Sequence, residues 1–148
     1  LCKHGFINGN DIMFIDNGSM NGRHSFVYTR SNKLYSFGFN NNGSLGGNFT
    51  DVSSSQLLRV ISFYDDSGGL VSSFECGSDH IGCLTIDNKI HMFGDNSSYQ
   101  CGYTNEIPNN HNILNLHDIG SIISIKCGEN HNIIQSCENK YYSFGDNS

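Results

Sequence analysis

Short hydrophobic stretches alternate with polar turns along much of the chain, and three pairs of these stretches share one layout. The first stretch of each pair is rich in β-branched and apolar residues and covers 25–29, 81–86 and 132–136. A polar turn that contains Asn follows, and the second stretch then covers 34–37, 90–93 and 141–144. Such runs on either side of an Asn-containing turn predict β-hairpins, with Asn at the position that needs a positive φ.

A further strand is predicted before the second and third hairpins. These stretches cover 70–74 and 122–125. The segments 48–69 and 103–121 are rich in Asn, Ser and Asp. We expect the latter two segments to be surface loops that connect the strands.

The hairpins belong to a longer repeat. Each copy has a His, and a Phe-Gly pair whose Gly lies 14 residues further on; the three His and Gly pairs are His24 and Gly38, His80 and Gly94, and His131 and Gly145. Gly77 and Gly128 stand three residues before the second and third His, each after a Cys, whereas an alignment without gaps puts Met20 and Asn21 there in the first copy. Successive His residues are 56 and 51 positions apart, a period typical of one propeller blade.

The repeat predicts a radial arrangement of small sheets. Several short strands per repeat fit a β-propeller, in which each sheet packs its faces against its neighbours. We expect the recurring His residues to be hydrogen-bonded anchors between blades, and the recurring Gly residues to lie where backbones approach closely or turn sharply. The repeats cover about 12–69, 70–121 and 122–148, the last incomplete, within one partial propeller.

The composition agrees with an all-β fold. The sequence has no Ala, no Trp and one Pro, and its 40 β-branched and aromatic residues of the types Val, Ile, Thr, Tyr and Phe exceed the 27 strong helix formers. The net charge of −6 gives a nucleic-acid backbone little to bind, so direct nucleic-acid binding is not expected. No apolar run is long enough to span a membrane.

The six cysteines are scattered and too few for a disulfide scaffold, which favours free thiols in a reducing compartment. We therefore expect an intracellular protein, cytoplasmic or nuclear. A secreted, disulfide-bonded β domain is an alternative, and a count of free thiols would distinguish the two.

The motif Cys-Gly-x-x-His, followed by Thr-x-Asp-x-x-Ile-x-x-Phe-Gly-x-Asn, resembles the regulator of chromosome condensation repeat family. Residues 75–102 are the closest match, and the resemblance covers about 12–148. It implies a seven-bladed propeller, of which this chain holds about two and a half to three blades, so that further repeats are needed to close the ring. The founding member of the family is a guanine-nucleotide exchange factor for the small GTPase Ran, and other members are interaction modules of ubiquitin ligases, ciliary proteins or further exchange factors.

The resemblance implies a protein-interaction module with a protein partner, such as a small GTPase, within a guanine-nucleotide exchange factor. The alternative is a non-catalytic, substrate-recruiting or scaffold propeller of a larger protein such as a ubiquitin ligase. An exchange factor makes and breaks no covalent bonds, so no catalytic residue and no cofactor are expected. No Gly-rich phosphate loop or oriented nucleophile is recognisable in the sequence.

Candidate partner-binding residues lie at positions that vary while the repeat framework is kept. The residue before each repeat His differs between copies, and charged residues lie in the 48–69 connector; the candidates are Arg23, Asp79, Asn130, Asp51, Arg59, Asp65 and Asp66. Cys76, His80, Cys127 and His131 have the residue types of a zinc site. We expect no metal there, because equivalent positions of neighbouring blades lie side by side around a ring rather than around one ion.

Overall fold

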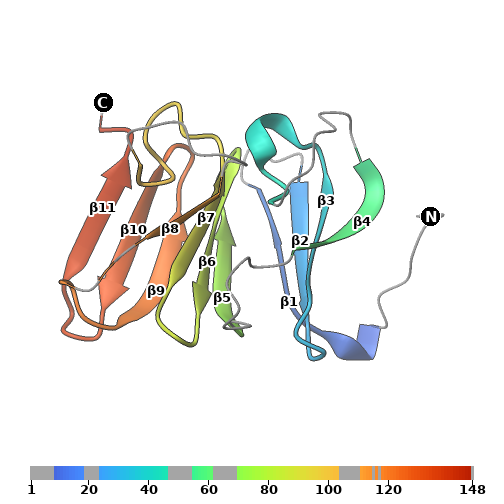
Figure 1. The fold of residues 1–148 in the computed structure, drawn as a ribbon, viewed down its shortest axis with the longest axis horizontal. Coiled ribbons are helices and arrows are strands. Elements are labelled where there is room, and N and C mark those ends of the chain that lie inside the picture. Colours follow the sequence, from blue (N-terminus) through green and yellow to red (C-terminus); the bar gives the residue numbers. More distant parts are fainter. Residues whose placement is uncertain are drawn as a thin grey trace.

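The computed structural model describes residues 9–18, 24–46, 55–61, 70–103, 111–114, 116 and 118–147. These residues form three antiparallel sheets that lie side by side in chain order (Figure 1). Sheet 1 contains β1 (Ile12–Asn17), β2 (His24–Thr29), β3 (Leu34–Gly38) and β4 (Ser55–Ile61); sheet 2 contains β5 (Val71–Cys76), β6 (His80–Thr85), β7 (Ile90–Gly94) and β8 (His111–Leu114); sheet 3 contains β9 (Ile122–Cys127), β10 (His131–Ser136) and β11 (Tyr141–Gly145).

Two short 3₁₀ helices, η1 (Gly9–Asp11) and η2 (Asn41–Gly43), are the other regular elements in the described part of the chain. The all-β prediction is therefore confirmed. None of the described helices is long and apolar enough to cross a membrane.

The predicted hairpins are present, and their turns have the expected conformation. In each turn an Asn has a positive φ: 60° at Asn32, 65° at Asn88 and 59° at Asn139. The backbone N–H of each Asn donates to a carbonyl three residues earlier, at 3.0 Å in all three turns. Asn tolerates this left-handed conformation better than most residues, which is why it recurs at this point of the sequence.

The prediction that 48–69 and 103–121 are connecting loops is wrong in part. Strand β4 lies within the first segment and β8 within the second. Each pairs with one strand only, β4 with β3 and β8 with β7, so each stands at the edge of its sheet. Neither strand alternates apolar and polar residues along its length, SQLLRVI in β4 and HNIL in β8, so the period-two signal of a strand is weak in both.

The three hairpins have the same register. In each sheet the repeat His pairs with the repeat Gly: His24 with Gly38, His80 with Gly94 and His131 with Gly145. The preceding strands follow the same rule, because Asn17, Cys76 and Cys127 each pair with the residue after the repeat His. The three repeats are thus three copies of one antiparallel unit.

This register corrects the alignment of the first copy. The N–H of Gly18 donates to the carbonyl of His24, as the N–H groups of Gly77 and Gly128 donate to His80 and His131. Asn17 and Gly18, not Met20 and Asn21, therefore stand for the Cys-Gly pair in sheet 1. The segment before His24 is three residues longer than in the other copies, which an alignment without gaps cannot show.

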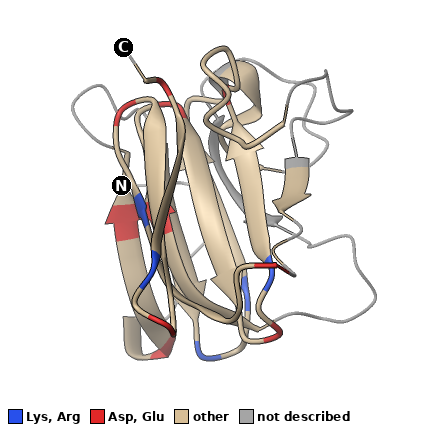
Figure 2. Ribbon diagram, turned by 90° about the vertical axis from the view of Figure 1, so that its left-hand side faces the viewer, with Lys and Arg blue, Asp and Glu red and all other residues tan. Residues whose placement is uncertain are grey.

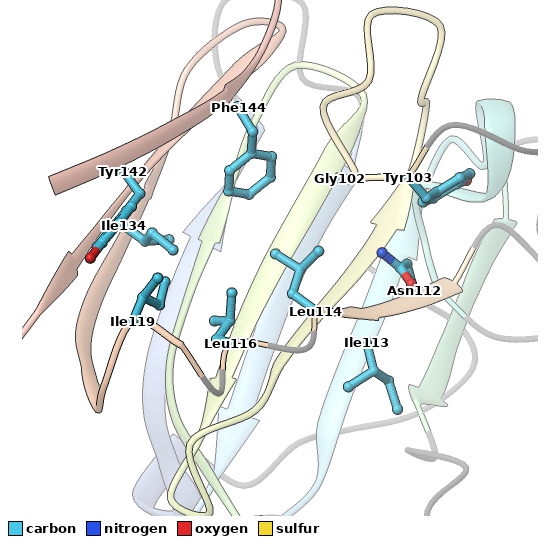
Figure 3. A pocket seen from close by; sticks show the side chains of 10 residues that line it. All are labelled: Gly102, Tyr103, Asn112, Ile113, Leu114, Leu116, Ile119, Ile134, Tyr142 and Phe144. Carbon is cyan, nitrogen blue, oxygen red and sulfur yellow. The ribbon is translucent and has the colours of Figure 1, made fainter.

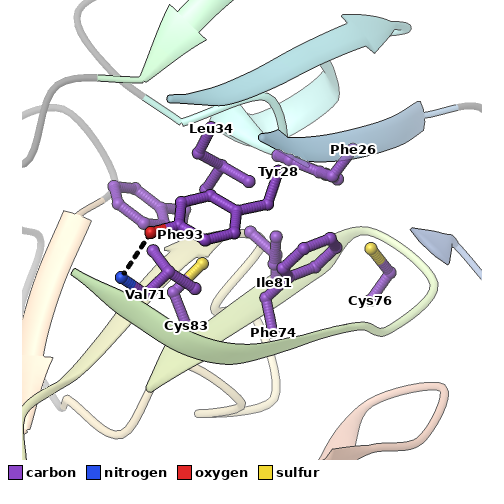
Figure 4. Packing of buried hydrophobic residues seen from close by; sticks show 9 residues of the cluster. All are labelled: Phe26, Tyr28, Leu34, Val71, Phe74, Cys76, Ile81, Cys83 and Phe93. Atoms are coloured by element: carbon purple, nitrogen blue, oxygen red, sulfur yellow. Dashed lines mark hydrogen bonds between the residues drawn. The ribbon is translucent and has the colours of Figure 1, made fainter. Parts of the chain in front are cut away.

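Successive sheets pack face against face. We call the face of a sheet that points to the next sheet along the chain its forward face, and the opposite one its backward face. Between sheets 1 and 2 the core contains Phe26, Tyr28, Leu34, Val71, Phe74, Cys76, Ile81, Cys83 and Phe93 (Figure 4). Between sheets 2 and 3 it contains Leu84, Ile90, Met92, Cys101, Ile122, Ile125 and Ile134. Strand β6 is buried along its whole length, because sheet 2 is covered on both faces.

Candidate protein-docking surface

Several loops that adjoin the repeat His and Gly residues lie at one end of the sheets. The loop 77–79 joins β5 to β6, the loop 128–130 joins β9 to β10, and the segments after β7 and β11 begin at the same end, since His80 pairs with Gly94 and His131 with Gly145. We call this the His end, and the end with the hairpin turns 30–33, 86–89 and 137–140 the turn end.

Backbone hydrogen bonds fix the loops of the His end. The N–H of Asp95 donates to the carbonyl of Asp79, and the N–H of Asp146 donates to that of Asn130, each at 2.8 Å. The repeat glycines permit this approach. Gly94 has φ +105°, and a Cβ atom there would lie 2.3 Å from the Asp79 carbonyl oxygen. The backbone before His80 and His131 is therefore held, while the side chain at that position, Asp79 or Asn130, differs between the two copies.

His80 and His131 pack on the loop glycines, and His80 also joins two sheets. A Cβ at Gly77 would lie 2.2 Å from the His80 ring, and one at Gly128 would lie 2.4 Å from the His131 ring. His80 Nε2 lies 2.9 Å from Oδ1 of Asn132 on the backward face of sheet 3. Asn132 Nδ2 in turn donates to the Gln100 carbonyl at 2.6 Å. This chain of bonds connects sheet 3 to both β6 and the loop after β7.

His24 differs from His80 in its surroundings. It is buried, and neither ring nitrogen has a hydrogen-bond partner among the described residues. The position equivalent to Asn132 is Ile81 in sheet 2, because each follows the repeat His, and an isoleucine cannot accept the bond. Burial lowers the pKa of His24, with Asp79 and Asp16 opposing the effect, and burial likewise lowers the pKa of His80. Both rings are held in the neutral form at neutral pH.

The loop after β7 is closed by its own side chains. Asp95 accepts bonds from Ser97 Oγ at 2.7 Å and from Gln100 Nε2 at 2.8 Å. Asn96 Oδ1 accepts the N–H of Cys101 at 2.8 Å, and in sheet 1 Asn40 Oδ1 accepts the N–H of Leu45 at 3.0 Å. These bonds explain why Asn recurs two residues after the repeat Gly.

The described loops of the His end are acidic. The segments 77–79, 95–100, 128–130 and 146–147 contain no Lys or Arg, and their charged residues are Asp79, Asp95, Glu129 and Asp146. Figure 2 shows acidic positions at this end, near the C label. At the turn end, acids and bases neutralise one another in ion pairs of 3.1 Å between Lys89 and Asp87 and of 2.7 Å between Lys140 and Glu138. The described surface therefore has one acidic end and one mixed end.

Of the residues predicted to bind a partner, the structure places Asp79 and Asn130 at equivalent points of the His end. Arg59 lies on the edge strand β4, away from them, and its side chain is outside the described residues. Arg23, Asp51, Asp65 and Asp66 also lie outside the described residues. Sequence reasoning missed Asp95, Glu129 and Asp146. The signal for two of them is the repeated triplet Gly-Asp-Asn at 94–96 and 145–147.

Of the described cysteines, Cys76, Cys83 and Cys101 are buried, Cys127 is half-buried and Cys137 is exposed. Burial raises the pKa of Cys76 and Cys83, and it raises that of Cys101 and of Cys127 to about 12. The five described cysteines are free thiols, which does not favour the disulfide-bonded alternative. Among the described residues no group of three His, Cys, Asp or Glu side chains is placed to hold a metal ion.

A groove of about 510 Å³ opens between sheets 2 and 3 (Figure 3). Its lining consists of Gly102, Tyr103, Asn112, Ile113, Leu114, Leu116, Ile119, Ile134, Tyr142 and Phe144. Burial raises the pKa of Tyr103 to about 12, so its phenol stays protonated at neutral pH. This lining offers apolar packing surface rather than a nucleophile with an oriented base.

Known proteins resemble the chain along most of its length, although no protein-family model matches it. Human protein RCC2 is 29% identical over 147 residues, which are 97% of this chain and 27% of that protein. The human X-linked retinitis pigmentosa GTPase regulator is 35% identical over 82 residues, 55% of this chain and 8% of that protein. The regulator of chromosome condensation of Drosophila melanogaster is 28% identical over 129 residues, 86% of this chain and 23% of that protein. The chain spans about a quarter of the length of RCC2.

Solved structures show the same fold. Human WBSCR16 superposes with a TM-score of 0.79 at 16% identity, over 96% of this chain and 35% of that one. Yeast RCC1 (Prp20) superposes with a TM-score of 0.77 at 20% identity, over 91% of this chain and 32% of that one. The β-propeller domain of Cps50 (Swd1) reaches 0.52 at 10% identity, over 92% of this chain and 40% of that one. The prediction of a partial β-propeller is confirmed: the chain folds as three successive propeller sheets, and its sequence resembles those of RCC2 and of the regulator of chromosome condensation.

Proposed function

We propose that the chain contributes a protein-docking face to a guanine-nucleotide exchange factor for a small GTPase, and that this face is the His end. The observation that carries the proposal is the acidic His end, where Asp79, Glu129 and Asp146 stand on loops whose backbone is fixed by the repeat. A rigid loop pays little conformational entropy on binding, and like charges on one face steer a partner of opposite charge.

The relatives support a partner of this kind. One relative is named a GTPase regulator, and the structure of Prp20p from Saccharomyces cerevisiae is described together with its binding to Gsp1p and histones. The partner surface that fits the His end is basic. An exchange factor binds the nucleotide-free GTPase more tightly than the loaded form, and by reciprocity the nucleotide then leaves faster. The proposal places the protein in the cytoplasm or nucleus.

Binding and nucleotide release together test the proposal. We expect the chain to bind one member of a panel of small GTPases, most tightly without nucleotide, and to accelerate the release of fluorescent GDP from it. The variant D79N/E129Q/D146N should weaken binding by about tenfold, because three rim charges at about 0.5 kcal/mol each are lost. D87N/E138Q is the control for the turn end, where it removes two carboxylates, Asp87 and Glu138.

Two results would contradict parts of the proposal. Equal binding by the two variants would remove the His end as the docking face. Binding without faster release would exclude exchange activity and support the alternative, a recruiting or scaffold propeller.

A further inference from the structure

The loop after β7 contains a tyrosine in a backbone conformation that favours glycine. Tyr99 has φ 61°. The other described non-glycine residues with a positive φ are all asparagines, namely Asn32, Asn42, Asn88 and Asn139. A bulky side chain in this left-handed region is strained, because its Cβ atom crowds the following carbonyl oxygen. In the described part of the chain, Tyr99 alone combines this conformation with a bulky side chain.

The corresponding loop of sheet 1 has a glycine at the same point. Gly43 has φ 76°. In both loops the carbonyl of this residue accepts the N–H of a glycine three positions later at 2.9 Å, that of Gly46 in sheet 1 and that of Gly102 in sheet 2. The two loops therefore share this turn, and a glycine satisfies it. The backbone of the loop gives no reason for the tyrosine.

No burial compensates for the strain at Tyr99, because its side chain is 59% exposed. The loop belongs to the middle repeat, which has sheet 1 on one side and sheet 3 on the other (Figure 1). The exposure therefore does not result from the first or last residue of the chain. Gly43 is also only half-buried, although sheet 2 follows it. Strained residues that the fold does not need are typical of functional sites.

The tyrosine stands on a rigid loop at the acidic His end. The loop begins at Asp95, whose N–H donates to the carbonyl of Asp79 at 2.8 Å. Gln100, the next residue after Tyr99, is fully buried, and its carbonyl accepts the bond from Asn132 of sheet 3. An exposed aromatic ring among carboxylates favours a cation, because the face of the ring attracts positive charge. Tyr and Arg are also enriched among the residues that dominate protein interfaces.

We propose that Tyr99 is the anchor residue of the His end and that its ring stacks against an arginine of a basic partner surface. This inference rests on the proposed docking role of the His end and adds the residue that dominates the contact and the side chain that it recognises. Arginine fits better than lysine, because a planar guanidinium can stack on a ring and also pair with a neighbouring carboxylate. The side chain then serves binding at the expense of stability.

Replacement of Tyr99 by glycine separates these two effects. Y99G restores the residue of the sheet 1 loop, so calorimetry should show a melting temperature higher by about 2–5 °C. Its affinity for the small GTPase that the wild-type chain binds should fall by about tenfold or more in a calorimetric titration. Y99F keeps the ring and should bind within about twofold of the wild type. Tyr141, 66% exposed at the start of β11 at the turn end, provides the control Y141A, which should bind normally.

A peptide probe tests the contact without the GTPase. The chain has no Trp, so Y99W places a single fluorescent indole at this position. A peptide of alternating Gly and Arg should change its emission, and the matching Gly and Lys peptide should bind more weakly by about threefold or more.

The outcomes distinguish this inference from the proposed function. A GTPase that Y99G binds as tightly as the wild type would overturn the inference and leave the proposed function in place. No GTPase binding, together with the expected arginine response of Y99W, would remove the proposed function only. An equal response of Y99W to both peptides, or to neither, would overturn the inference. A lower melting temperature of Y99G would also overturn it, because the ring would then serve the fold.

Discussion

The difference between His24 and His80 shows how much a single neighbouring residue decides. Both rings are buried at the same register position of their sheets. His80 bonds to the amide of Asn132 in sheet 3, whereas the corresponding position of sheet 2, opposite His24, is Ile81, and His24 has no hydrogen-bond partner among the described residues. A buried polar group without a partner costs about 1–3 kcal/mol. The first junction is therefore less stable than the second at this position.

The variant I81N should supply the missing partner. A buried Ile changed to Asn ordinarily costs a few kcal/mol, because apolar packing is lost and a polar group is buried. We expect the loss in unfolding free energy to be smaller by about 1–2 kcal/mol when His24 is present than in an H24F background, as measured by chemical denaturation. I81A, which offers no acceptor, serves as the control. Equal losses in both backgrounds would show that the two side chains do not meet.

The buried histidines also set a pH dependence. Because burial lowers their pKa below the ordinary value of 6.5, the unfolded chain binds more protons than the folded chain just below that pH. The free energy of unfolding should be highest above pH 6.5 and should fall as the pH drops below it, by at most about 1.4 kcal/mol per pH unit for each histidine. Thermal melts between pH 7.5 and 5.5 measure this.

The variant H24F should reduce the slope, whereas H131Q, which changes an exposed repeat histidine, should leave it nearly as it is. A slope that H24F does not change would show that His24 titrates normally.

At the scale of the element, the hairpin turn serves two purposes. Asn88 has the positive φ that closes its own turn, and it also caps the first N–H of the next sheet. Asn139 has the same backbone conformation, and its amide oxygen accepts a long bond of 3.4 Å from Gln135 within its own sheet, with no acceptor role toward another sheet among the described residues. Substituting each residue therefore distinguishes two contributions to the free energy of unfolding: that of the turn conformation, which both residues have, and that of the bond between sheets, which Asn88 makes.

We expect N88A to lower the free energy of unfolding by about 1 kcal/mol more than N139A does. Both changes place Ala in a left-handed conformation, but only N88A leaves the Ile122 N–H without its acceptor. Urea denaturation of the two variants gives the difference. Equal losses would mean that the Asn88 bond adds nothing between the sheets.

Much of the element layout was predictable from the sequence. Hairpins such as 80–94 combine an apolar run, an Asn turn and a second run, and that signal is local. Strands β4 and β8 were not predictable, because an edge strand is defined by the partner that it pairs with rather than by its own pattern. The equivalence of Gly18 with Gly77 was hidden by three additional residues, and only the register of β1 reveals it.

The docking surface was predictable in part. The variable residue before each repeat His identified the His end through Asp79 and Asn130. Asp95 and Asp146 were missed although the triplet Gly-Asp-Asn repeats at 94–96 and 145–147, because only the register shows that these carboxylates lie at the same end as Asp79 and Asn130. Whether any of these residues binds a partner stays a prediction.

At the scale of the whole molecule, the chain is an array in which each sheet depends on its neighbours for burial. Sheet 2 is covered on both faces, while sheets 1 and 3 each present one outer face with exposed apolar residues. Stability in such arrays is approximately a sum over sheets and their junctions, so the contacts at each junction contribute to the stability of both sheets that it joins. The shared register of the sheets brings the acidic loops together at the His end.

The central claim is that the repeat His of one sheet lies against the residue that follows the repeat His of the next sheet, and the contact of His80 with Asn132 tests it most directly. The test is a double-mutant cycle with H80A, N132A and the double variant. Asn132 also bonds to Gln100, but the loss of that bond occurs whether or not His80 is present, so it cancels in the coupling energy. We predict a coupling energy of about 1–2 kcal/mol from urea denaturation. A coupling energy indistinguishable from zero would contradict the claim, because the two side chains would then stand apart.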